Sequence, residues 1–413
     1  MNRFTRYAII ALSVLIIGWV GFGKVLGRSA NDNTYKSLIV YGEVLQKIQQ
    51  DYVDEPNMRL VTAGSLHGLL ESLDSESSYL TPREYTEYKQ KSASAITGET
   101  GLNLSKRFGY AIVTSVLPDT SAEKAGLHSG DILESIAGFT TREMSVGQAK
   151  NLLAGQPGTG VKVGVIRRGK TDPEEIEVVR EKLSAPKLIA QRVENDTLAL
   201  RFPTLDAGRA EEVRTRLLDA QKQGVSKVIL DLRECGRGPV SEAIAIARLL
   251  VPSGQLVALR GQTVPAQVFS ADATKVVWKG AVSILMDGTT TGAAEVLAAS
   301  LANTKRGDLV GDRTFGLASE QKLIPLDDGA ALFLTVADYY NADGKSILEE
   351  GVAPTEVVRA SAASSDDSND GEDVTPTPGT PKDSTIGPRP LSSDDPVLRR
   401  ALELLKSPVK KAA

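Results

Sequence analysis

Val228-Ile-Leu-Asp-Leu232 is a mostly apolar run that leads into a glycine-bearing turn, and an amphipathic segment follows it from Ser241 to Leu250. An apolar run of this kind is typical of a strand buried on both faces of a parallel sheet. Ala281-Val-Ser-Ile-Leu-Met286 repeats the pattern, with a turn at Asp287-Gly288 and a helical segment after it. Successive strand–turn–helix units predict an α/β layer domain, which we assign to residues 184–358.

The chain before this domain changes pattern twice. Residues 96–183 contain short β-branched runs, such as Tyr110–Leu117 and Val161–Ile166, separated by glycine turns, and these predict strands. Residues 31–95 instead space their apolar residues at helical intervals, which predicts an N-terminal helical domain. Within it, Tyr79-Leu80-Thr81-Pro82 predicts the opening of a third short helix, because proline is favoured in a first helical turn.

The N-terminus predicts a membrane anchor over residues 1–30. An uncharged, largely apolar run of 17 residues extends from Tyr7 to Gly23, about 25 Å as a helix, which is short but adequate for a span. Arg3 and Arg6 favour a cytoplasmic N-terminus, so the body of the chain would be extracytoplasmic. The alternative is a cleaved signal peptide, but a cut after Ala30 would place Arg28 where a small residue is preferred.

The C-terminal part of the chain divides into a linker and a helix. Residues 359–395 are rich in Ser, Asp, Pro and Gly and hold too few aliphatic residues to form a core, so we expect a disordered linker. Residues 396–413 carry one apolar helical stripe, formed by Val397, Leu398, Ala401, Leu404 and Leu405. This C-terminal helix is expected to dock onto the body, with a membrane surface as the less favoured alternative.

The composition excludes several kinds of chemistry. The chain has 413 residues, with 48 Lys+Arg against 52 Asp+Glu, and this near-neutral charge gives no reason to expect nucleic-acid binding. The single cysteine, Cys235, excludes an internal disulfide and any CxxC motif. His67 and His128 are the two histidines, too few for a histidine-rich metal site. We therefore expect neither a metal nor a cofactor.

Short motifs follow one another in a fixed order from about Tyr35 to Lys406. They include Asp51-Tyr-Val-Asp-Glu55, Ser72-Leu-Asp74, Gly101-Leu-Asn-Leu104, Gly155-Gln-Pro-Gly-Thr159, Leu230-Asp-Leu-Arg233, Thr314-Phe-Gly316 and Asp343-Gly-Lys-Ser-Ile347. In order and spacing they resemble the C-terminal processing, or tail-specific, serine proteases. The resemblance implies an α+β multidomain fold: an N-terminal helical segment, a PDZ β-domain over residues 96–183 and a protease-like α/β domain over residues 184–358. It also implies a bacterial, periplasmic setting for an anchored chain.

The resembling family cuts peptide bonds with a Ser-Lys dyad, and both dyad positions are altered here. In the family the serine lies three residues before a glutamate, and the lysine follows Phe-Gly 25 residues after the serine. With Glu295 as the glutamate, these positions are Gly292 and Leu317, and their separation is again 25 residues. Glycine has no side chain that could act as a nucleophile, and leucine has no group that can accept a proton. Gln321, at the place of a family glutamine thought to orient the lysine, is retained.

The loop that resembles the family's oxyanion region is altered as well. Arg237 replaces the first of two glycines after Leu-Asp-Leu-Arg, and Pro239 lacks an N–H group. Backbone donors for an oxyanion need an open loop, so the chain is identified as a degenerate, inactive member of a serine-type peptidase family. A rewired nucleophile among Ser319, Thr290 and Thr291, with Lys322 nearby, remains the alternative.

The PDZ part retains its peptide-binding motif. In relatives the Gly-Leu-x-Leu turn offers backbone N–H groups to a terminal carboxylate while the peptide adds as a strand. The matching residues are Gly101, Leu102, Asn103 and Leu104, whereas Ala154 stands where relatives often have arginine. The sequence therefore predicts a pseudoprotease that binds protein C-termini, unfolded polypeptide or an active homologue. An active serine endopeptidase and a structural subunit of an envelope complex are the alternatives.

Overall fold

The computed structural model describes residues 32–93, 97–107, 109–167, 170, 172–359, 391–392 and 394–406. The predicted anchor lies outside the described residues, as does nearly all of the predicted linker. No helix within the described ranges is long and apolar enough to cross a bilayer. The chain divides into two compact units, Met1–Ser65 and Leu66–Ala413.

Two helices form the described part of the first unit. These are α2 (Asp32–Asp51) and the beginning of α3 (Met58–Glu71), which continues into the second unit. The hydroxyl groups of Tyr41 and Ser65 are hydrogen-bonded at 2.5 Å and join the two helices. The helical spacing of residues 31–95 thus corresponds to real helices.

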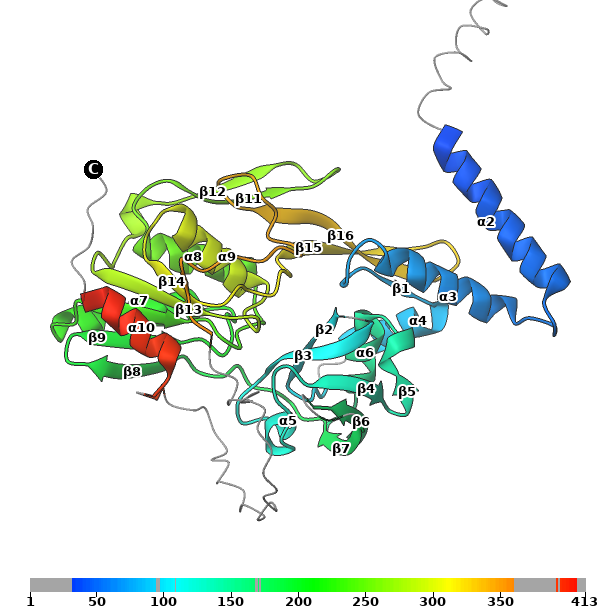
Figure 1. The fold of residues 1–413 in the computed structure, drawn as a ribbon, viewed down its shortest axis with the longest axis horizontal. Coiled ribbons are helices and arrows are strands. Elements are labelled where there is room, and N and C mark those ends of the chain that lie inside the picture. Colours follow the sequence, from blue (N-terminus) through cyan, green and yellow to red (C-terminus); the bar gives the residue numbers. More distant parts are fainter. Residues whose placement is uncertain are drawn as a thin grey trace, which may run out of the picture. The chain divides into compact units, whose positions relative to one another are not determined.

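The second unit contains a six-stranded sheet that is covered by helices (Figure 1). Its order is β17 (Glu356–Val357), β14 (Asp308–Gly311), β13 (Ala281–Met286), β10 (Lys227–Asp231), β9 (Thr197–Arg201) and β8 (Ile189–Glu194). The pairs from β17 to β9 are parallel and β8 is antiparallel. The two apolar runs from which the fold was predicted are β10 and β13, which lie side by side in the middle of this sheet.

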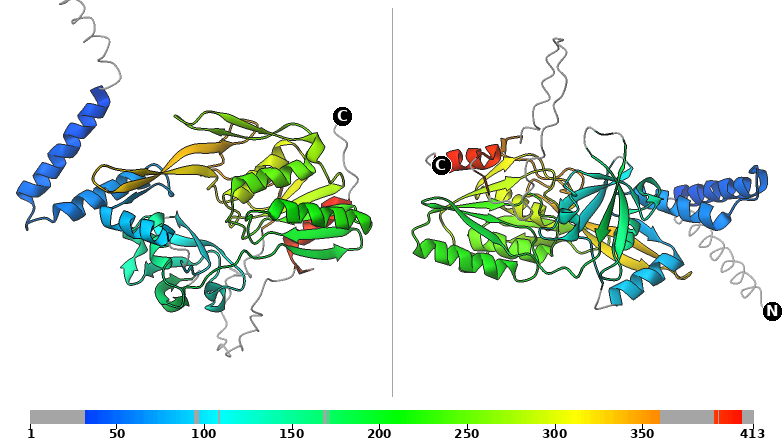
Figure 2. Two further views of the ribbon diagram at one scale, coloured as in Figure 1. Left: turned by 180° about the vertical axis from the view of Figure 1, so that it is seen from behind. Right: turned by 90° about the horizontal axis from the view of Figure 1, so that it is seen from below.

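Helices cover both faces of the six-stranded sheet. On one face lie α7 (Arg209–Lys222), α8 (Val240–Leu250) and α9 (Ala293–Asn303), which share a large apolar core with β10 and β13. On the other face α10 (Pro396–Lys406) packs Val397, Leu398 and Ala401 against the alternate strand residues Ile229 and Leu285. Figure 2 shows α10, in red, on the face of the sheet opposite the green helices. The predicted α/β layer is confirmed.

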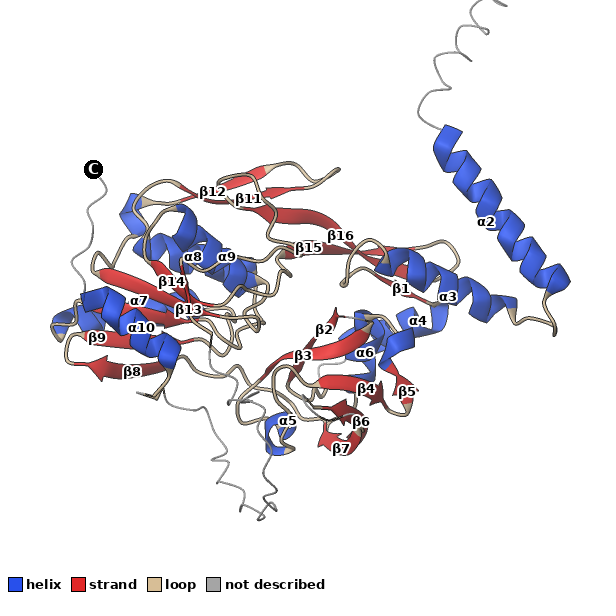
Figure 3. Ribbon diagram, viewed as in Figure 1, coloured by secondary structure: helices blue, strands red, loops and turns tan. Residues whose placement is uncertain are grey.

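A smaller β-domain precedes this layer in the chain. Its sheet runs β2 (Leu102–Arg107), β3 (Tyr110–Val116), β4 (Ile132–Ile136), β6 (Gly160–Ile166) and β7 (Glu174–Val179), with β5 (Phe139–Thr140) paired to β4. Two short α-helices, α5 (Ser121–Lys124) and α6 (Val146–Leu153), accompany the strands (Figure 3). Strand β2 lies at one end of the sheet, and among the described residues no strand pairs with its outer edge.

A second antiparallel sheet contains residues that were predicted to open the third N-terminal helix. It runs β1 (Ser78–Leu80), β16 (Ala331–Tyr340), β11 (Gln255–Arg260) and β12 (Gln267–Ser270), with β15 (Ser319–Pro325) on the other edge of β16. The predicted third helix does not open at Tyr79, because Tyr79 and Leu80 are buried in β1 against β16. Helix α4 (Pro82–Ala93) begins only at Pro82, where Thr81 and Glu84 cap each other's backbone N–H groups.

Candidate functional site

Gly292 lies in the turn between β13 and α9, in a backbone conformation that side-chain-bearing residues rarely adopt. Its φ is 56° and its ψ is −117°. A Cβ atom built on Gly292 would find no atom within 4 Å among the described residues, so the turn points into open space. A strained strand-to-helix turn of this kind is how serine hydrolases expose their nucleophile. The turn is kept here without the nucleophile.

Glu295 joins Gly292 and Leu317, the two predicted dyad positions, through its buried carboxylate. One carboxylate oxygen accepts hydrogen bonds from the Thr314 hydroxyl and the Gly316 N–H group, each at 2.6 Å. The other oxygen accepts from the backbone N–H groups of Gly292 at 2.8 Å and Leu317 at 2.7 Å. Two positions 25 residues apart in sequence are therefore held by one oxygen atom. Burial raises the pKa of Glu295 to about 6, and the four hydrogen bonds act in the opposite direction.

Gly292 and Leu317 open into a cavity of about 440 Å³ that also touches the smaller β-domain. The wall contains Leu102, Asn103 and Leu104 of β2, Lys150 and Leu153 of α6, Gly236 and Arg237 of the loop after β10, and Glu76 and Glu99. A volume of this order suits a small ligand or a short peptide segment. The altered dyad positions and the edge of β2 thus share one binding space.

Every ionisable side chain in the cavity wall is already paired. Lys150 contacts Glu76 at 3.1 Å, and Arg237 contacts Glu99 at 2.8 Å. The hydroxyl of Ser105 donates a further hydrogen bond to Glu76 at 3.0 Å. A general base needs a free basic group within hydrogen-bond reach of the nucleophile. The four charged groups that line this cavity each have a charged partner instead.

The predicted peptide-binding residues lie along this same cavity. Leu102, Asn103 and Leu104 line it, and α6 packs against β2 beside them. Gly101 shapes the turn before β2: its φ is 89°, and a Cβ atom there would lie 2.4 Å from the Thr120 hydroxyl oxygen. A larger residue at Gly101 would therefore displace the start of the strand.

The comparisons with known proteins identify two domains. Residues 196–358 match peptidase family S41, and residues 112–167 match the PDZ domain. The chain carries an S41 peptidase domain and a PDZ domain. The S41 match extends from β9 to β17 and includes the Glu295 turn, and the PDZ match extends from within β3 to the end of β6.

Relatives of the chain have names that describe trimming of C-termini. The chain is 28% identical over 331 residues to the carboxy-terminal-processing protease of Bartonella bacilliformis, covering 79% of this chain and 76% of that one. It is 26% identical over 349 residues to the carboxy-terminal processing protease CtpA of Bacillus subtilis, covering 84% of this chain and 74% of that one. Its fold is similar to the solved structure of the photosystem II D1 C-terminal processing protease, with a TM-score of 0.64, 23% identity and coverage of 78% and 92%.

The candidates for a rewired nucleophile in the S41 domain have other contacts. Thr290 is fully buried and donates its hydroxyl hydrogen bond to the carbonyl of Leu232 at 3.0 Å. Thr291 lines the cavity, but the charged groups there are paired. Ser319 lies in β15, and neither Ser319 nor Lys322 lines the cavity.

Two further sequence candidates lie away from the cavity surface. Gln321, the retained supporting residue, is exposed on β15 and does not line the cavity. Cys235 is fully buried below the loop, and burial raises the pKa of its thiol to about 12, so it is a packing residue. Neither residue has a place in the binding space.

Sequence reasoning missed Glu99 and Lys150, which supply charge to the cavity. Glu99 lies where the chain enters the PDZ domain, and its partner Arg237 follows 138 residues later, so no local pattern could have linked them. Lys150 lies on α6, in a stretch where the sequence predicted only short strands and turns.

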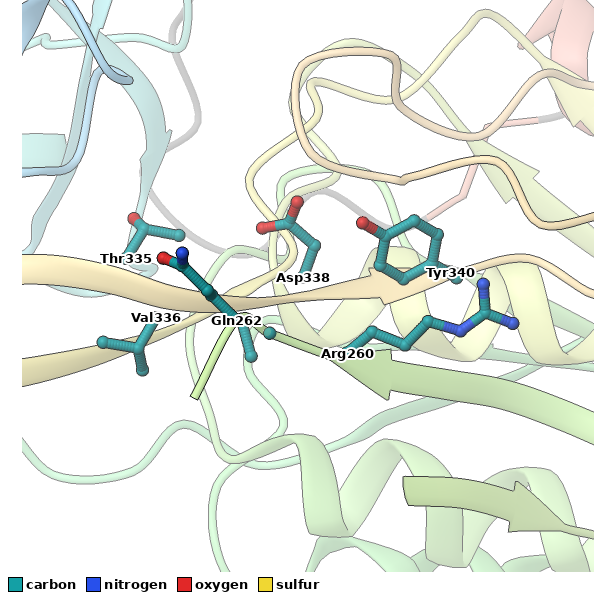
Figure 4. A pocket seen from close by; sticks show the side chains of 8 residues that line it. Arg260, Gln262, Thr335, Val336, Asp338 and Tyr340 are labelled. Carbon is teal, nitrogen blue, oxygen red and sulfur yellow. The ribbon is translucent and has the colours of Figure 1, made fainter. Parts of the chain in front are cut away.

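A second cavity, of about 410 Å³, lies beside β16 (Figure 4). Its wall includes Arg260, Gln262, Asp338 and Tyr340, with the Arg260 guanidinium 5.0 Å from the centre of the Tyr340 ring. None of the predicted site residues lines this second cavity.

Proposed function

We propose that this protein is a non-hydrolysing S41 homologue that binds the C-termini of other polypeptides. The observation that carries the proposal is the shared cavity: Gly292 and Leu317 open into it without a nucleophile or a base, and its four charged side chains are paired. Losing either half of a catalytic pair removes most of its activity, and losing both removes little more. What the cavity retains is the capacity to bind.

The edge of β2 supplies the binding mode. A PDZ domain takes an extended peptide as an added strand, with main-chain hydrogen bonds for affinity and pockets for alternate side chains. The outer edge of β2 has no strand partner among the described residues, and Leu102, Asn103 and Leu104 of this strand line the cavity. Relatives named as C-terminal processing proteases support a chain end as the ligand.

We further propose that the protein is a single-pass protein of a bacterial cell membrane with a periplasmic body. The support is the apolar run from Tyr7 to Gly23 and its basic N-terminal flank. In that position its ligands would be C-termini of envelope proteins, unfolded polypeptide or an active protease homologue. A purely structural role in an envelope complex is the competing proposal.

The full chain, purified in mild detergent, is expected to leave an unfolded substrate such as β-casein intact while retaining peptides with free C-termini. The physical reason is that peptide hydrolysis needs an activated nucleophile, whereas strand addition needs only a free sheet edge. Mass spectrometry of the substrate and fluorescence anisotropy of labelled peptides measure the two properties. Cleavage that disappears in Ser319→Ala would establish the rewired peptidase instead, and an absence of affinity for any C-terminus would leave only the structural role.

Restoring the dyad by Gly292→Ser with Leu317→Lys is expected to give no more than a small fraction of a family member's activity. Arg237 and Pro239 still alter the oxyanion loop, and one lost oxyanion donor alone reduces kcat by about 10²–10³. A serine at the φ of 56° also adds strain of about 1–3 kcal/mol. The matched control adds Arg237→Gly to the double variant, and its peptidase rate should exceed that of the double variant. Robust proteolysis by the double variant alone would show that the oxyanion loop is functional as it stands.

A further inference from the structure

Arg237 and Glu99 form a planar, two-bond ion pair inside the wall of the shared cavity. One guanidinium nitrogen lies 2.8 Å from one carboxylate oxygen of Glu99, and a second nitrogen lies 3.2 Å from the other oxygen. Both residues line the cavity, and their side chains are 38% and 45% exposed. The arginine fork thus holds a carboxylate that a ligand entering the cavity would meet.

The position of this pair matches the end of the proposed peptide groove. Glu99 lies three residues before Leu102, the first residue of β2. A peptide that adds antiparallel to β2 would finish beside the beginning of that strand. Its terminal carboxylate would therefore lie close to the carboxylate of Glu99.

The backbone on both sides of the pair is held in place. Arg237 accepts a backbone hydrogen bond from Leu205 at 2.7 Å, and Gly238 abuts Leu205 so closely that a Cβ atom would lie 2.2 Å from its carbonyl oxygen. Glu99 exchanges two backbone hydrogen bonds with Glu181, at 2.9 and 2.8 Å. Exchange of the carboxylate held by Arg237 therefore requires only side-chain rotation.

The other cations near this end of the groove bind backbone carbonyls or another carboxylate. Lys91 donates to the carbonyls of Asn151 and Ala154 at 2.5 and 3.1 Å, and so satisfies the free carbonyls at the end of α6. Arg180 donates to the carbonyl of Leu153 at 3.0 Å in the same way. Lys150 is the one other cation among the cavity-lining residues, and it pairs with Glu76.

We infer that Arg237 is the receptor for the terminal carboxylate of a bound polypeptide, and that Glu99 occupies this receptor until the ligand displaces it. The inference rests on the proposed binding of C-termini and names the residue that selects for them. Arginine presents a planar fork that matches a carboxylate, so Arg237 suits this task better than Lys150. Arg237, which replaces a glycine in the loop that resembles the family's oxyanion region, thereby acquires a binding role.

The test uses a pool of fluorescent decapeptides randomised at the last three positions, prepared once as free acids and once as C-terminal amides. Retention of each pool by the immobilised full chain is measured for the wild type and for Arg237→Gln, Arg237→Lys, Glu99→Gln and Lys150→Gln, which removes the other cation of the cavity wall. The wild type should prefer free acids by about tenfold, the effect of one charge-assisted contact. Arg237→Gln should reduce this preference to less than about twofold, and Arg237→Lys should leave an intermediate preference.

Glu99→Gln distinguishes a displaced occupant from a merely structural bridge. It should strengthen binding of free acids by about fivefold or more and leave amide binding unchanged, because the competing internal charge is removed. A preference for free acids that survives Arg237→Gln, or that is lost in Lys150→Gln, would assign the carboxylate to another group and overturn the inference. Equal retention of acids and amides by the wild type would overturn the inference alone, whereas retention of neither pool would overturn the proposed function with it.

Discussion

Replacing Glu295 with glutamine should lower the free energy of unfolding by about 3–5 kcal/mol. The substitution keeps the size of the side chain but changes one acceptor oxygen into an NH₂ group. That group would face either the N–H groups of Gly292 and Leu317, or the N–H group of Gly316 and the Thr314 hydroxyl, which can turn to accept, in a site that is fully buried. A buried donor without a partner costs about 1–3 kcal/mol, and two are lost here.

Urea unfolding followed by circular dichroism at a pH of about 7.5, where a carboxyl with a pKa of about 6 is ionised, measures this effect. Glu211→Gln is the matched control, since Glu211 is an exposed carboxylate paired with Arg214 on α7. This substitution should lower the free energy of unfolding by less than about 1 kcal/mol. If Glu295→Gln were no more damaging than this control, the four hydrogen bonds would not be what joins the two dyad positions.

Leu398→Asp should lower the free energy of unfolding by at least about 4 kcal/mol and give largely insoluble protein. Leu398 is 2% exposed and packs with Val397 against the face of the sheet that contains Ile229 and Leu285. The substitution removes apolar contacts and also places a charge between α10 and the sheet. Expression in the soluble fraction and urea unfolding measure the result.

Arg399→Asp is the matched control for Leu398→Asp, because it places the same residue on the exposed side of the same helix. It should change the free energy of unfolding by less than about 1 kcal/mol. Equal losses from both substitutions would mean that introduced charge, and not the docking of α10, decides the outcome.

The docking of α10 also depends on polar contacts that link it to β10. The Asp395 carboxylate accepts from the N–H groups of Val397 and Leu398 at 2.9 and 3.3 Å and so caps the helix. The same side chain lies 2.7 Å from Arg233, which in turn pairs with the buried Asp231 at the end of β10 at 2.8 Å. The Leu-Asp-Leu-Arg motif, one of those that carry the resemblance to the C-terminal processing proteases, therefore also anchors the C-terminal helix.

Much of the fold follows from local pattern. A buried parallel strand must be apolar on both faces, so the runs at Val228 and Ala281 identified the centre of the sheet. The third predicted helix was wrong at its start because Tyr79 and Leu80 are buried by β16, a strand some 250 residues later in the chain. Local spacing reports that a residue will be buried, but it does not report which partner buries it.

The sequence by itself determined that Gly292 and Leu317, the predicted dyad positions, carry neither a nucleophile nor a base, because that is a property of single residues. Only the tertiary structure decided what connects them: one carboxylate of Glu295 holds both positions, and one cavity joins them to the edge of β2. The pairing of Arg237 with Glu99, 138 residues away, is of the same kind. Such contacts arise when the folded backbone brings distant segments together, and neither partner carries a local sign of the other.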